Sequence, residues 1–63
     1  MAILTEQIIT TPDPEYPENY GFVTATVVNT ETGERSTASS EYDLFTKESE
    51  ATASAIQSAT DKL

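Results

Sequence analysis

The sequence has no cysteine, no histidine and no tryptophan, and only three basic residues among its 63. Without cysteine no disulfide can form, and without cysteine or histidine zinc and copper lack their preferred protein ligands. A chain this short makes one domain at most and buries only about 60% of the surface that it exposes when unfolded. Very economical packing would suffice, but small domains are commonly stabilised by a partner subunit. We therefore expect a homo-oligomer, most simply a dimer.

Targeting segments and phosphate-binding loops are missing as well. Residues 1–10 have neither the basic stretch nor the apolar run of a signal peptide, and no segment approaches the roughly 20 apolar residues of a membrane span. The two isolated glycines, Gly21 and Gly33, cannot build a phosphate-binding loop. We expect a cytoplasmic protein that does not bind membranes.

The charge is strongly acidic, with 11 Asp and Glu residues and a net charge of −8. Such a charge keeps a protein soluble and repels nucleic acids, so we expect no direct nucleic-acid binding. The acidic surface either meets a basic partner, as a mimic of a nucleic-acid backbone would, or serves solubility or adaptation to a salty cytoplasm. The acids are spread along the whole chain, which suits both interpretations.

Residue patterns predict an α+β fold, with a three-stranded antiparallel sheet in the order 1-2-3 and one C-terminal helix packed on one face. The predicted elements of this single small domain, residues 1–63, are a strand at 3–10, a proline-rich loop at 11–19, a strand at 20–29, a hairpin turn at 30–34, a strand at 35–44 and a helix at 46–63. The strand order is the simplest one, because successive strands usually neighbour each other.

The three predicted strands differ in how clearly they alternate. The first carries apolar residues on both faces, so either both faces are partly covered or a β-bulge shifts the register. The second alternates well, and Val23, Ala25 and Val27 form a face suited to packing under a helix. Its other face, half polar, carries Phe22, Thr24, Thr26 and Val28.

Turn and helix signals complete the pattern. Gly33 can supply the positive φ of a type I turn with a G1 bulge. Thr46 is the predicted N-cap, and Lys62 falls in the last helical turn, where a basic residue is favoured. An alanine stripe with four-residue spacing gives the helix its apolar face: Ala51, Ala55, Ala59.

Catalytic chemistry has few candidates. Glu41 and Asp43 share one strand face and Glu48 and Glu50 one helix turn, but both carboxylate pairs are expected to be solvated. A domain this small also cannot build a pocket that buries a substrate. The acidic run at 13–18 lacks the spacing of a calcium-binding EF-hand loop. We expect neither an enzyme nor a bound metal or cofactor.

Two functional hypotheses remain. The first is an acidic protein-interaction module, for example a phage or mobile-element type inhibitor of a nucleic-acid-handling enzyme. Its partner-binding residues would lie in the proline-rich loop, where an aromatic anchor stands among acids that steer association: Asp13, Glu15, Tyr16, Glu18. Alternatively, Tyr16 folds back onto the sheet.

The second hypothesis is a structural homo-oligomer with any ligand site between subunits. Its interface would be the half-polar face of the second strand, formed by Phe22, Thr24, Thr26 and Val28, packed across a symmetry axis. Edge strands that join into a continuous sheet are the other arrangement.

Overall fold

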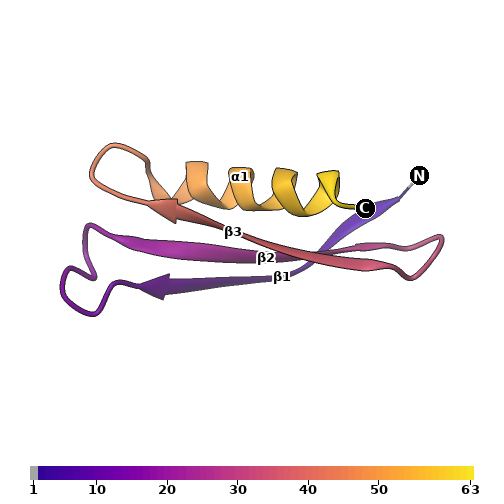
Figure 1. The fold of residues 1–63 in the computed structure, drawn as a ribbon, viewed down its shortest axis with the longest axis horizontal. Coiled ribbons are helices and arrows are strands. Elements are labelled where there is room, and N and C mark those ends of the chain that lie inside the picture. Colours follow the sequence, from indigo (N-terminus) through magenta and orange to yellow (C-terminus); the bar gives the residue numbers. More distant parts are fainter. Residues whose placement is uncertain (1) are drawn as a thin grey trace.

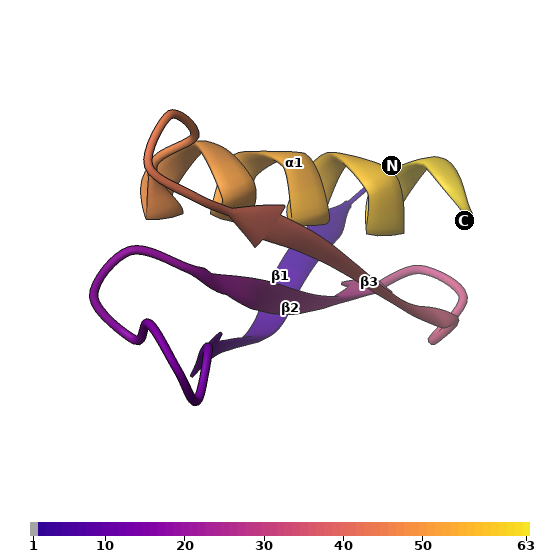
Figure 2. The same cartoon turned by 60° about the vertical axis from the view of Figure 1, so that its left-hand side comes forward.

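The computed structural model describes residues 2–63, which form a three-stranded sheet followed by one helix (Figure 1). The elements are β1 (Ile3–Pro12), β2 (Gly21–Asn29), β3 (Arg35–Tyr42) and α1 (Glu48–Asp61). The strands are antiparallel in the order β1-β2-β3, and α1 lies on one face of the sheet (Figure 2). The predicted α+β fold with this strand order and a C-terminal helix is confirmed.

The core lies between α1 and the helix-facing side of β2. Its completely buried side chains are Val23, Ala25 and Val27 of the strand and Ala51, Ala55 and Ala59 of the helix. Alternate strand residues share one face, and residues four apart share one helix face, so both patterns present a single apolar side. Because alanine is small, α1 can approach β2 and β3 closely, although it makes few contacts with β1.

β1 is an edge strand whose residues are almost all exposed. Its register against β2 shifts between Thr5 and Gln7, so Glu6 is the extra residue of a β-bulge. The bulge offered as one explanation for the poor alternation is confirmed. Beyond it, Ile8 lies opposite a helix-facing residue of β2 and Ile9 opposite a residue of the other face. Ile8 stays exposed because α1 hardly reaches β1, and Ile9 because it lies on the face away from α1.

The hairpin between β2 and β3 closes as predicted. Gly33 adopts a φ of 79°, and its N–H donates to the Asn29 carbonyl at 2.7 Å. Asn29 in turn donates its N–H to the Glu34 carbonyl at 2.8 Å, and its side-chain oxygen accepts the N–H of Glu31 at 2.9 Å. The asparagine therefore holds the turn from both its backbone and its side chain.

Strand ends differ from the predicted bounds at the side of the proline-rich loop. β1 continues to Pro12, which pairs with Gly21, and proline is tolerated there because an edge strand needs only alternate N–H groups for its ladder. β3 ends at Tyr42, so Leu44 lies in the connection to the helix and is 61% exposed.

Thr46 is not the N-cap of the helix. Lys47 occupies the cap position without a side-chain hydrogen bond, and α1 begins at Glu48. The backbone of Thr46 is used by a preceding turn, because its N–H donates to Asp43 Oδ1 at 2.7 Å and its carbonyl accepts the N–H of Asp43 at 3.0 Å. Asp43 thus caps this turn and uses the backbone groups of Thr46, so the helix begins only at Glu48.

Both ends of the described chain complete the core. Ile3 and Leu63 pack, together with Ile56, against the buried cluster of Val27, Ala38 and Ala59. The helix ends at Asp61, so Lys62 is its C-cap and not part of the last turn. Over residues 2–63, no helix is both long and apolar enough to cross a membrane.

Candidate partner-binding surface

Two connections meet at one end of an elongated molecule that measures 40 × 18 × 14 Å. The loop between β1 and β2, the loop between β3 and α1, and the first turn of α1 all lie at this end (Figures 1 and 2). Residues of the two loops line shared depressions, which shows that they are neighbours. We call this region the loop end.

The proline-rich loop has a defined hydrogen-bonded shape. Asp13 Oδ1 accepts the N–H of Glu15 at 2.8 Å and that of Tyr16 at 3.2 Å, an Asx turn at the loop start. The Tyr16 carbonyl accepts the N–H groups of Asn19 at 3.1 Å and Tyr20 at 2.9 Å. The rings of Tyr16 and Tyr20 pack edge to face with centroids 5.8 Å apart. The loop therefore holds its aromatic residues against each other.

The connection between β3 and α1 is organised in the same way. Asp43 Oδ1 accepts the N–H of Phe45 at 2.8 Å as well as that of Thr46. These two backbone hydrogen bonds, that from Thr46 first, hold the pKa of Asp43 below its ordinary value of 3.8. The Phe45 side chain in this turn is 91% exposed.

Large apolar side chains are unusually exposed at the loop end. Tyr16 is 58%, Leu44 61% and Phe45 91% exposed. Leu44 lines the same depression as Tyr16 and Tyr20, so the two loops share one apolar patch there. The Tyr16 ring packs on its loop neighbour Tyr20 and stays more than half exposed, so it is not buried against the sheet.

Acidic residues are concentrated at the same end of the molecule. Those of the two loops, the end of β3 and the first turn of α1 are Asp13, Glu15, Glu18, Glu41, Asp43, Glu48 and Glu50. These are seven of the 11 acids of the chain, and with Lys47 as the one base among them they give the loop end −6 of the net charge of −8. Acids that are spread along the sequence therefore gather in space.

The structure brings together the four residues predicted for partner binding. Asp13, Glu15 and Tyr16 line one depression, and Glu18 joins Glu15 and Tyr16 in an adjacent one. Leu44 and Phe45 were not among the predicted partner-binding residues, because Leu44 was assigned to the third strand and Phe45 to no element. The available signal was the pair of large apolar residues placed between two acidic stretches.

The predicted oligomer interface lies on the sheet face opposite α1. Phe22 is 41% exposed there, whereas Val28 is only 8% exposed. The Thr24 hydroxyl pairs with that of Ser39 at 2.9 Å, and the Thr26 and Thr37 hydroxyls pair at 3.2 Å. These cross-strand bonds satisfy the hydroxyls within the chain. They make the middle of this face polar.

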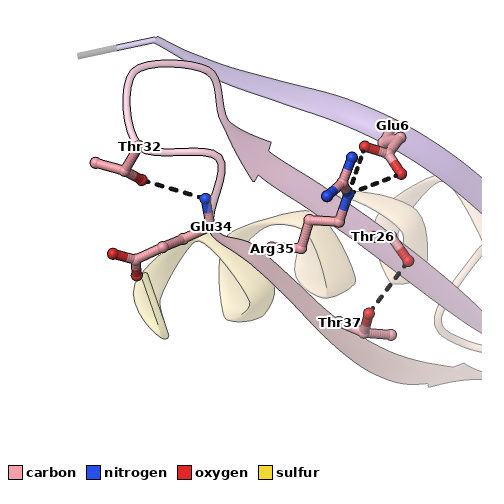
Figure 3. A network of polar contacts seen from close by, with 6 residues as sticks. All are labelled: Glu6, Thr26, Thr32, Glu34, Arg35 and Thr37. Carbon is pink, nitrogen blue, oxygen red and sulfur yellow. Dashed lines mark hydrogen bonds and ion pairs between the residues drawn. The ribbon is translucent and has the colours of Figure 1, made fainter.

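A polar pair crosses the same face near the hairpin turn. Arg35 Nε of β3 donates to both carboxylate oxygens of Glu6, at 2.9 and 3.2 Å (Figure 3). The pair spans from the bulge in β1 across β2, and both side chains remain largely exposed. An exposed ion pair contributes at most about 1 kcal/mol. Its main effect is that the one charged residue of β1 has a partner.

No group of three or more metal-binding side chains is assembled within residues 2–63. Comparisons of the sequence and structure with protein-family models, curated proteins and solved structures find no match.

Proposed function

We propose that this chain is a small protein-interaction module whose loop end binds a basic surface of another protein. The observation that supports the proposal is that the exposed side chains of Tyr16, Leu44 and Phe45 lie at the same end of the molecule as seven of the 11 acids. Protein interfaces commonly have aromatic anchors at their centre and a polar rim around them. The loop end has both parts in one place.

Phe45 is the strongest candidate for the anchor. Burial of a phenylalanine side chain is worth roughly 1.5–3 kcal/mol relative to exposure. At 91% exposure this free energy is almost entirely unused within the chain, and a partner with an apolar pocket would recover it. The surrounding carboxylates would accelerate association with a basic protein and make it sensitive to salt.

The class of partner that we propose is a nucleic-acid-handling enzyme, inhibited in the manner of a phage or mobile-element type inhibitor. Such an enzyme offers a basic surface that normally contacts phosphates. The loop end presents carboxylates from two loops and a helix, with Lys47 as the one base among them, and would occupy that surface as a nucleic-acid mimic. Competition between this protein and duplex DNA for the partner would test the mimicry.

The binding test compares two matched sets of variants in affinity capture from source cells, followed by calorimetry with the captured partner. Phe45→Ser should weaken binding at least about tenfold, the effect of about 1.4 kcal/mol at a hot spot. Removal of two loop-end charges by Glu15→Gln and Glu18→Gln should slow association. The same charge change at the hairpin turn, Glu31→Gln with Glu34→Gln, should leave the affinity within about twofold, because those residues lie at the other end.

A second aromatic variant makes the test independent of Phe45. Tyr16→Ala should also weaken binding, with the far-ultraviolet circular dichroism spectrum unchanged. If Tyr16→Ala and Phe45→Ser both bind as the wild type does, the loop end is not the binding surface and the acidity serves solubility.

A structural homo-oligomer with any ligand site between subunits is the second candidate, and the exposed apolar residues of the sheet favour it. Besides Phe22, the uncovered face carries Leu4 at 57% and Ile9 at 47% exposure. If the predicted interface operates, Phe22→Glu should convert the oligomer to a monomer in light scattering. An unchanged mass would exclude this face.

A further inference from the structure

The outer edge of β1 presents backbone groups that the sheet does not use. The N–H of Asp13 donates to the Tyr20 carbonyl at 2.9 Å, which continues the ladder between β1 and β2. Backbone groups point to opposite sides at successive residues of a strand. Because Thr11 is two residues from Asp13, its backbone N–H and C=O groups also point toward β2. Those of Ile8 and Thr10, at the alternate positions, point away from it. An edge of this kind is a template for another strand.

The other edge of the sheet is better protected. On β3, the carbonyl of Thr37 accepts a hydrogen bond from Lys62 Nζ at 3.1 Å. The same strand carries charged residues near both of its ends, Arg35 and Glu41. Charges and covering groups are the usual means by which proteins prevent edge pairing. Within residues 2–63, β1 is thus the edge that is open to a further strand.

β1 also carries little charge for an edge strand of an acidic chain. Its one charged residue, Glu6, lies in the bulge and faces Arg35 (Figure 3). From Gln7 to Thr11 the strand carries no charge and pairs with β2 in regular register. Two copies of the chain can therefore bring these edges together without placing like charges opposite each other.

We propose that two copies of this chain pair through their β1 strands, antiparallel about a two-fold axis at Ile9, to form one six-stranded sheet. This register keeps the pairing within the regular stretch that the bulge and Pro12 enclose. Ile8 and Thr10 of each copy then exchange backbone hydrogen bonds with Thr10 and Ile8 of the other. The two Ile9 side chains meet as a non-hydrogen-bonded pair on the uncovered face, where such pairs lie closest.

A second copy fits this edge better than a strand from a different protein. A two-fold axis makes the segment its own partner: Ile9 lies opposite Ile9, and Ile8 lies opposite the uncharged, β-branched Thr10. Antiparallel pairing also separates the acidic loop ends. The two Asp13 residues lie eight residues apart along the paired strands, about 27 Å at ~3.4 Å per residue. That distance exceeds the Debye length of about 8 Å at physiological salt, so their repulsion is screened.

This inference concerns a different surface from the loop end and does not depend on binding there. The pairing would cover apolar surface on both faces of β1, because Ile8 and Ile9 are 40% and 47% exposed in the single chain. The affinity is expected to be modest, since the contact is one short strand pair. The mass should therefore rise with concentration.

Cysteine cross-linking tests the register directly, because the chain has no cysteine of its own. Ile9→Cys places two thiols opposite each other with Cα atoms about 4.5 Å apart, within the range that a disulfide spans. It should oxidise readily to a covalent dimer. Thr11→Cys is the control on the same strand and face, since its two copies would be about 14 Å apart. Equal cross-linking of both variants, or of neither, would overturn the proposed register.

Light scattering over a concentration series tests the interface itself. The wild type should move from 6.8 kDa toward twice that mass, and Ile9→Lys should remain a monomer because two ammonium groups would meet at the axis. Ser39→Lys adds the same charge in the same row of the sheet, but on β3, and should dimerise as the wild type does. A monomeric wild type at millimolar concentration, or a dimer broken by Phe22→Glu and not by Ile9→Lys, would contradict pairing through β1.

Discussion

Replacement of Gly21 by alanine should destabilise the protein although the added methyl group is small. A Cβ built at Gly21 would lie 2.6 Å from the Thr11 carbonyl oxygen and 2.6 Å from Cζ of Tyr42, with the Tyr42 hydroxyl closer still. The tyrosine can move, but the carbonyl belongs to the backbone of the paired strand. Either β1 or β2 must shift to accept the methyl group.

The expected loss in the free energy of unfolding combines two opposing effects. Overpacking costs roughly 1–3 kcal/mol, and replacement of glycine by alanine returns about 0.4–1 kcal/mol through the entropy of the unfolded chain. We expect a net loss of about 1–2 kcal/mol. A 63-residue domain has roughly 3–9 kcal/mol of stability in total. The midpoint of thermal unfolding should fall by roughly 4–16 °C at about 4–8 °C per kcal/mol.

Urea unfolding followed by circular dichroism measures this loss, and two further variants locate its cause. Gly21→Ala combined with Tyr42→Ala should be less destabilised than the sum of the single changes, because one of the two clashes is removed. Gly33→Ala has no atom within 4 Å of its added Cβ and should lose about 1–2 kcal/mol from its φ of 79° alone. A Gly21→Ala variant as stable as the wild type would refute the close approach of Tyr42 and Thr11.

Two further predictions concern the core and the pH dependence. Val27→Ala removes two buried carbon atoms beside Ala38 and Ala59 and should cost about 1–3 kcal/mol in urea unfolding, whereas a loss under about 0.5 kcal/mol would mean that the site is loosely packed. Asp43→Ala should be less stable than the wild type at neutral pH, because the charged carboxylate accepts two backbone hydrogen bonds. Its folded-state pKa is lowered from 3.8, so this contribution is present above pH 3.8 and is lost as the pH falls through the lowered value. The stability gap between variant and wild type should therefore close in acid, and a gap that persists there would contradict the ionic role.

Local patterns were sufficient to predict most of the fold. Strict alternation placed Val23 and Val27 on the helix-facing side of β2, and four-residue spacing placed Ala55 in the core. The hairpin turn was predictable because Gly33 can adopt the positive φ that the turn requires. Each of these signals acts over a few residues and needs no knowledge of the rest of the chain.

The errors arose where two local signals competed or where contacts are distant in sequence. Thr46 and Asp43 can both cap backbone groups, and the sequence pattern does not say which one prevails. The strand ends near the proline-rich loop depended on pairing of Pro12 with Gly21, which is a tertiary event.

The candidate site was predicted in part. The proline-rich loop residues, such as Tyr16, do lie together, but the contribution of the second loop was missed. The gathering of acids from position 13 to position 50 follows from antiparallel topology, which returns the chain to the same end after β3. Phe45 could not be identified as exposed until the strand was known to end at Tyr42.

The helix that covers β2 follows all three strands in the sequence, and this order has a kinetic consequence. Strands β1, β2 and β3 pair only with their neighbours in sequence, so both hairpins can form early and fast. Until α1 docks, however, the row of Val23, Ala25 and Val27 faces water, and an exposed apolar sheet is prone to aggregation. We expect that the helix docks in the same cooperative step that stabilises the hairpins, and that chains shortened within it are found mainly in aggregates.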